Sequence, residues 1–175
     1  LRQYAITNGA ENNAGEQVKI NHQRLYKDIL AARTASSDTS AVQAAVYKSL
    51  WSTSNDEAWA AMRAVHYQLG FIYTKERLGQ TQPQPLDVVD FIGLLGRGER
   101  LIKNSTTWNT YKTALGIDLY ATNSITNHEL LYVLSSMIIG KDMRLMFAHY
   151  GIPLGDTALN SVAAHKLPAI TPEFY

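Results

Sequence analysis

Apolar residues recur at helical spacing along most of this 175-residue chain, and this pattern most constrains its fold. A helix brings residues three and four positions apart onto one face, so such spacing predicts amphipathic helices. The clearest run has these recurring positions: Trp59, Met62, Val65, His66, Leu69, Ile72 and Tyr73. Strand-favouring residues nowhere alternate with polar ones over a sustained stretch. The sequence therefore predicts an all-α fold.

Capping residues and glycines divide this pattern into separate helices. We expect a first helix from Glu16 and a second after residue 38. Ser54 and Glu57 have the spacing of a capping box, so a third helix should begin there and end at Gly79. Gly70 lies inside this third run, where its low helix propensity would permit a break.

The second half of the chain predicts further helices. Residues 86–103 have helical spacing, and the glycines at 93, 96 and 98 would either admit a close backbone or mark a kink. Ser105 or Thr106 should cap the next helix, which ends at Gly116. Residues 126–168 predict three short helices joined by two glycine stops. Together the runs predict an irregular bundle of about seven to eight helices.

We expect these helices to form one domain, because the composition does not change along the chain. The only linker-like segment, residues 80–85 with the sequence QTQPQP, is interpreted as an inter-helix connection that can act as a hinge. Residues 1–15 predict an irregular N-terminal segment, residues 16–168 a single helical domain, and residues 169–175 a tail. A chain that starts at Leu1 is expected to be a processed piece or an expressed fragment of a longer protein.

Charge and composition exclude several classes of partner. The chain has 16 basic and 15 acidic residues, so it lacks the basic excess typical of nucleic-acid-binding proteins. No apolar run approaches the ~20 residues that a helix needs to cross a bilayer. The absence of cysteine excludes disulfides, thiolate metal ligands and a cysteine nucleophile. We therefore expect no nucleic-acid partner and no membrane span.

The nearest match to a catalytic motif is the pair His128-Glu129. Zinc peptidases use H-E-x-x-H, in which two histidines one turn apart bind the metal and the glutamate acts as general base. Here the position of the second histidine holds Tyr132. Thr126 and Glu129 have capping-box spacing, so we interpret the pair as part of a helix start. The sequence thus predicts no catalytic residue and no metal ligand in this chain.

One aromatic group is a candidate for substrate binding. Its members are Trp108, Tyr111 and Tyr120, which lie among amides and carboxylates. Exposed aromatic rings in such surroundings bind sugars or extended peptides by stacking and hydrogen bonding. In helices, however, aromatic residues more often belong to the core. Both interpretations are open from the sequence alone.

Residues 130–168 resemble the C-terminal helical part of enhancin-like zinc metallopeptidases, a family that includes bacterial mucin- and glycoprotein-degrading enzymes. The resemblance rests on Gly140-Lys141-Asp142-Met143, on Phe147, on Tyr150-Gly151-Ile152-Pro153-Leu154, and on the final Leu167-Pro168. In that family the zinc is held by H-E-x-x-H and a downstream glutamate, in a part that precedes this region. The motif is absent here, so no catalytic residue is carried over.

The resemblance implies a non-catalytic helical subdomain of a zinc metallopeptidase that acts on glycosylated proteins. Such a subdomain would pack beside the catalytic domain of the same polypeptide and line the substrate groove. The zinc would belong to the parent enzyme, so this chain is expected to hold no cofactor and to be inactive alone. The family is typically secreted or exposed at the cell surface. The alternative is a stand-alone helical module that binds a protein or a glycan.

Overall fold

The computed structural model describes residues 56–81, 85–125 and 127–171, with a few single positions between residues 27 and 41. The predicted irregular segment at 1–15 lies outside the described residues, as do nearly all of the first two predicted helices and Ser54. The structural account therefore concerns the part of the chain that begins at Asp56.

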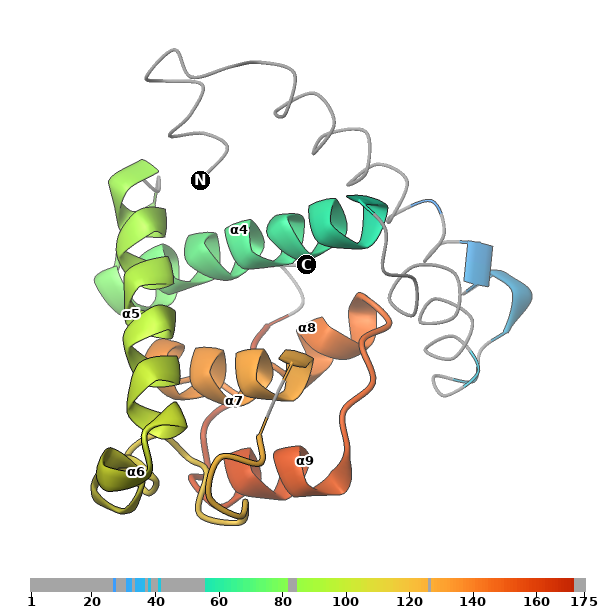
Figure 1. Cartoon of the computed structure of the whole chain (residues 1–175). Coiled ribbons are helices and arrows are strands. Elements are labelled where there is room, and N and C mark those ends of the chain that lie inside the picture. Colours follow the sequence, from blue (N-terminus) through green and yellow to red (C-terminus); the bar gives the residue numbers. More distant parts are fainter. Residues whose placement is uncertain are drawn as a thin grey trace.

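This part of the chain is built from helices. They are α4 (Asp56–Leu78), α5 (Pro85–Lys103), α6 (Ser105–Tyr111), α7 (Asn127–Ile139), α8 (Arg144–His149) and α9 (Asp156–Ala163) (Figure 1). Across the described ranges the backbone forms no strand, only one isolated bridge between Asp142 and Ala169. The all-α prediction is confirmed, with six helices described against the seven to eight predicted for the whole chain. None of the described helices is both long and apolar enough to cross a membrane.

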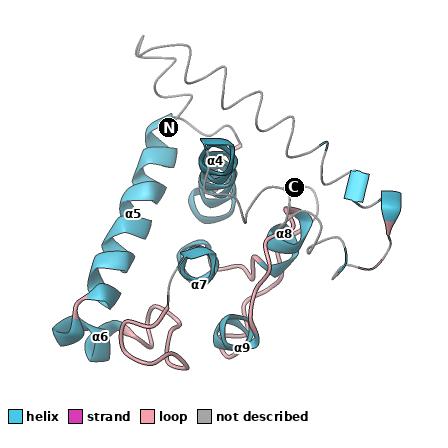
Figure 2. Ribbon diagram, turned by 45° about the vertical axis from the view of Figure 1, so that its right-hand side comes forward, coloured by secondary structure: helices cyan, strands magenta, loops and turns pink. Residues whose placement is uncertain are grey.

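Helix α7 lies at the centre of the fold. It packs against α4, α5 and α9, and Figure 2 shows it nearly end-on with these helices and α8 around it. All the side chains from Leu130 to Ser136 are buried. Ser135 and Ser136, which interrupt the apolar run, are both satisfied: the Ser135 hydroxyl donates to the Tyr132 carbonyl, and the Ser136 hydroxyl accepts from the Met143 N–H. Burial on every side explains why α7 lacks a polar face.

Two glycines allow these helices to approach one another closely. Helix α4 continues unbroken through Gly70, where an added Cβ would lie 2.7 Å from Val88 Cγ1 of α5. In α5 an added Cβ at Gly98 would lie 3.2 Å from both Leu134 methyl groups of α7. The break allowed at Gly70 is therefore absent, and close packing is the role of Gly98.

Helix ends follow the predicted glycine stops in most places. Gly140 ends α7 with φ 79° and Gly151 ends α8 with φ 68°, a left-handed conformation that glycine adopts at little cost. Helix α6 differs from the prediction at both ends. Its N-cap is Asn104, not Ser105 or Thr106, and its regular part ends at Tyr111 before a series of turns reaches Gly116.

The packed part of the chain extends past the predicted end at residue 168. Asp142 N–H donates to the Pro168 carbonyl at 2.8 Å, and Ile170 N–H donates to the Asp142 carbonyl at 3.1 Å. Ile170 is 2% exposed and belongs to the core. These backbone bonds attach Ala169 and Ile170, the first residues of the predicted tail at 169–175, to the α7–α8 junction, residues 140–143.

Candidate functional site

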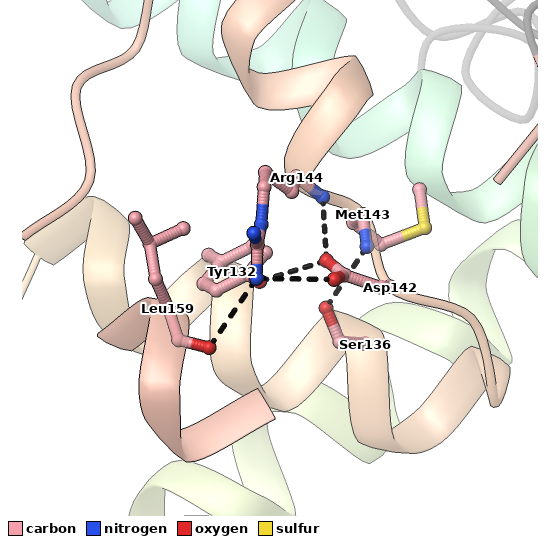
Figure 3. Close-up of polar contacts among 6 residues, drawn as sticks. All are labelled: Tyr132, Ser136, Asp142, Met143, Arg144 and Leu159. Atoms are coloured by element: carbon pink, nitrogen blue, oxygen red, sulfur yellow. Dashed lines mark hydrogen bonds and ion pairs between the residues drawn. The ribbon is translucent and has the colours of Figure 1, made fainter. Parts of the chain in front are cut away.

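The α7–α8 junction contains a compact polar network (Figure 3). The Tyr132 hydroxyl donates to Asp142 Oδ1 at 2.8 Å, and the same oxygen accepts from the Arg144 backbone N–H at 2.9 Å. The Arg144 guanidinium lies 3.4 Å from Asp142 Oδ2 and also reaches the Leu159 carbonyl of α9. Asp142 therefore ties α7, α8 and, through Arg144, α9 together.

The surroundings of the Tyr132 hydroxyl keep it protonated. Burial raises the pKa of its hydroxyl above the ordinary value, and the hydrogen bond to Asp142 raises that pKa further. The phenol is thus protonated at neutral pH and acts as a hydrogen-bond donor. Its ring packs edge-on against Phe147 with the ring centroids 5.4 Å apart. These are the properties of a structural anchor.

The other residues of the Gly140–Met143 motif also make structural contacts. Lys141 Nζ lies 3.1 Å from Glu76 Oε2, which links the junction to α4. Met143 is fully buried, as are Phe147 and Tyr150. The Ile152 N–H donates to the Phe147 carbonyl at 2.9 Å as the chain turns at Gly151. These residues of the peptidase resemblance therefore fix the geometry of the junction.

His128 and Glu129 join the start of α7 to two distant segments. We define these as the α6–α7 connection, residues 112–125, and the α8–α9 connection, residues 150–155. Glu129 Oε2 accepts from the Tyr120 hydroxyl at 2.9 Å, and Glu129 Oε1 accepts from the Gly155 N–H at 3.0 Å. His128 is hydrogen-bonded to the backbone of Pro153. Burial lowers the pKa of His128, and the neighbouring Glu129 carboxylate opposes that shift.

The pair lies in the first turn of α7, as predicted, but its contacts extend beyond that helix. The capping-box partner Thr126 lies outside the described residues, and the described hydrogen bonds of Glu129 lead to other segments. Gly155 lets the Glu129 carboxylate lie close to the backbone, since an added Cβ would lie 2.8 Å from Glu129 Oε1 and the carboxylate would have to move. No group of three His, Asp or Glu side chains suited to a metal ion occurs among the described residues.

The structure separates the three aromatic candidates. Trp108 is 2% exposed and lies in the core, so its indole is not at the surface as a ligand-stacking role requires. Tyr120 is half-buried with its hydroxyl bound to Glu129, and the same burial raises its pKa. Tyr111 is 39% exposed. The sequence did not indicate that Leu119 is also a large exposed apolar side chain, with 57% of its surface accessible. Substrate binding by this group stays a prediction, now resting mainly on Tyr111.

Solved structures of a metallopeptidase share this fold. The chain is similar to IMPa metallopeptidase from Pseudomonas aeruginosa, with 26% identity and a TM-score of 0.69 over 86% of this chain. IMPa metallopeptidase in complex with T-antigen gives 26% identity and a TM-score of 0.68 over 85% of this chain. The P. aeruginosa IMPa structure in complex with an O-glycopeptide, 24% identical, has the same fold with a TM-score of 0.67. Comparison with protein-family models and with curated proteins gives no match.

The similarity concerns one region of a larger enzyme. The chain spans 17% of the length of these IMPa structures. The fold similarity and the family resemblance of residues 130–168 both indicate a region of a metallopeptidase.

Proposed function

We propose that this chain is a non-catalytic helical subdomain of a secreted bacterial zinc metallopeptidase that acts on glycosylated proteins. It packs beside the catalytic core of the same polypeptide and lines the substrate groove, and the zinc belongs to that core. The observation that carries the proposal is the fold similarity to IMPa metallopeptidase over 86% of this chain but 17% of the enzyme. The IMPa complexes with T-antigen and with an O-glycopeptide support glycosylated proteins as the substrate class.

The non-catalytic role is supported by the composition of the His128-Glu129 site. A peptidase zinc site needs a second histidine one turn after the first, and this position holds Tyr132. The Tyr132 hydroxyl is bound to Asp142, while Glu129 accepts hydrogen bonds from two other segments. Recruiting these side chains to a metal would require breaking contacts that stabilise the fold.

Zinc titration of the chain by calorimetry tests this role directly. We expect no tight one-to-one binding, and tight binding that His128→Gln abolishes would overturn the proposal. The genomic test is independent, because the reading frame upstream of Leu1 should encode H-E-x-x-H. If that reading frame lacks the motif, the chain does not belong to a zinc peptidase of this kind.

The second candidate is a helical module that binds a glycan or a protein. It is favoured by the exposed ring of Tyr111, which lies close to Asn109 and Thr110 in sequence. Tyr111→Ala should abolish binding on a glycan array, and Tyr111→Phe should retain it because the stacking ring is kept. Binding that is absent, or that is unchanged by Tyr111→Ala, argues against this candidate. Trp108→Ala is unsuitable for this test because it would disrupt the core.

A further inference from the structure

One surface of the described fold exposes almost no charge. It is formed by α6 and the α6–α7 connection, which Figure 1 shows beside the end of α5. Between residues 104 and 124, Asp118 is the only charged side chain that is exposed, and Lys112 is half-buried. The other exposed polar side chains carry hydroxyl or amide groups, among them Asn109, Thr110 and Thr122. We call the exposed side chains of residues 104–124 the neutral face.

This composition distinguishes the neutral face from its neighbours. Soluble protein surfaces usually intersperse charges of both signs, as α5 does with its exposed Asp90, Arg97 and Arg100. A charged side chain loses its hydration when a ligand covers it, and an uncharged ligand does not compensate that loss. Hydroxyl and amide groups lose less, and each of them can both donate and accept hydrogen bonds. The neutral face is therefore suited to a ligand that carries no charge.

Hydrogen bonds and burial hold the neutral face in one shape. The Thr113 hydroxyl donates to Asp118 Oδ1 at 2.7 Å and so closes the turn that follows α6. The large exposed side chains of Tyr111 and Leu119 lie just outside this turn in sequence, while the buried indole of Trp108 attaches α6 to the core. A surface that is ordered before binding loses less conformational entropy when a ligand binds.

We propose that the neutral face binds an uncharged glycan, with the Tyr111 ring stacking on a sugar and the surrounding side chains binding its hydroxyl groups. The inference rests on the second candidate function, and it narrows the ligand of that module from a glycan or a protein to a glycan without charge. Sugar hydroxyls both donate and accept hydrogen bonds, as do those of serine and threonine. The tyrosine ring offers a rigid apolar surface to the C–H face of a sugar.

Other ligand classes fit the neutral face less well. An extended peptide often binds by adding a strand to a sheet edge, and the described part of the chain forms no strand. The core of a protein interface is largely apolar, whereas Leu119 is the only large aliphatic side chain exposed here. A sialylated glycan carries a carboxylate, and the only exposed charge on this face is the like charge of Asp118.

A glycan array with matched pairs of uncharged glycans and their sialylated forms tests the ligand class. The chain should bind at least one uncharged glycan, and its sialylated form about tenfold more weakly, equivalent to ~1.4 kcal/mol. Equal binding within the pairs, or binding of sialylated glycans alone, overturns the inference but leaves a glycan-binding module. An array without any bound glycan overturns the inference and removes the glycan from the second candidate function.

Paired variants test whether the neutral face is the site. Asn109→Asp replaces an amide by a carboxylate of nearly the same shape and should weaken glycan binding about tenfold, whereas Asn160→Asp on α9 should leave it unchanged. Both asparagines are exposed, so neither change should disturb the fold. Leu145→Ala on α8, where Leu145 is 45% exposed, is the matched control for Tyr111→Ala and should also leave binding unchanged. Binding that Asn109→Asp does not weaken, or that the controls weaken equally, places the site elsewhere and refutes the proposal.

Discussion

Substituting Gly70 with alanine should destabilise the protein, although alanine favours helix formation. In α4, alanine at this position gains roughly 1 kcal/mol over glycine. Against this, the added Cβ would lie 2.7 Å from Val88 Cγ1, 3.3 Å from its Cβ and 3.4 Å from its Cα. Because the position of the Val88 Cβ is fixed by the α5 backbone, a rotamer change can move Cγ1 away but cannot relieve the tight contact with Cβ. Such overpacking costs about 1–3 kcal/mol, so the net loss is about 0–2 kcal/mol.

Gly93 of α5 offers a matched control for this substitution. An added Cβ there meets no atom within 4 Å, so Gly93→Ala should stabilise the protein by roughly the full propensity gain of 1 kcal/mol. The difference between the two variants isolates the packing cost, about 1–3 kcal/mol. Urea unfolding followed by far-ultraviolet circular dichroism measures both free energies. Equal stabilisation of the two variants would refute the close approach of α4 and α5 at Gly70.

Three further predictions concern the aromatic residues and His128. Trp108→Ala should cost about 3–5 kcal/mol in urea unfolding because it empties a buried site, whereas Tyr111→Ala should stay within about 0.5 kcal/mol; comparable losses would contradict the assigned burial. Tyr132→Phe should cost roughly 1–3 kcal/mol, since it removes the donor to Asp142 but keeps the ring, and an unchanged unfolding midpoint would show that this bond adds nothing. The melting temperature should fall as the pH drops below 6.5, the ordinary pKa of His128, because burial lowers that pKa in the folded state; His128→Gln should flatten this slope, and an equally steep slope in the variant would assign the effect to another group.

Local signals explain which parts of the fold the sequence could predict. The glycine stops at Gly140 and Gly151 were predictable, because a helix ends where a left-handed residue is needed and glycine adopts that conformation at little cost. The start of α6 was not, because Asn104, Ser105 and Thr106 are three capping residues in succession. The structure uses Asn104, whose side chain accepts from the Thr106 N–H at 2.9 Å, and N-cap preference does not separate asparagine from serine.

The candidate site depended on contacts that no local pattern contains. Glu129 has the spacing of a helix cap, yet its partners Tyr120 and Gly155 are 9 and 26 residues away in sequence. Gly155 was a recognisable glycine, but only the carboxylate beside it shows what an added Cβ would displace. Burial of Trp108 likewise depends on which face of α6 meets the core, and a helix as short as α6 has too few turns to define that face from sequence.

The motifs that resemble a peptidase family make contacts that stabilise the fold. Asp142 bonds to Tyr132 and to the segment that includes Pro168 and Ile170, and Gly151 ends α8. A substitution at such a position disturbs several helices at once, so these residues are tied to the fold and not to a particular reaction. A match to these residues is therefore stronger evidence for a shared fold than for a shared activity. For this reason the decisive test of function is whether H-E-x-x-H precedes Leu1, and not any substitution within the junction.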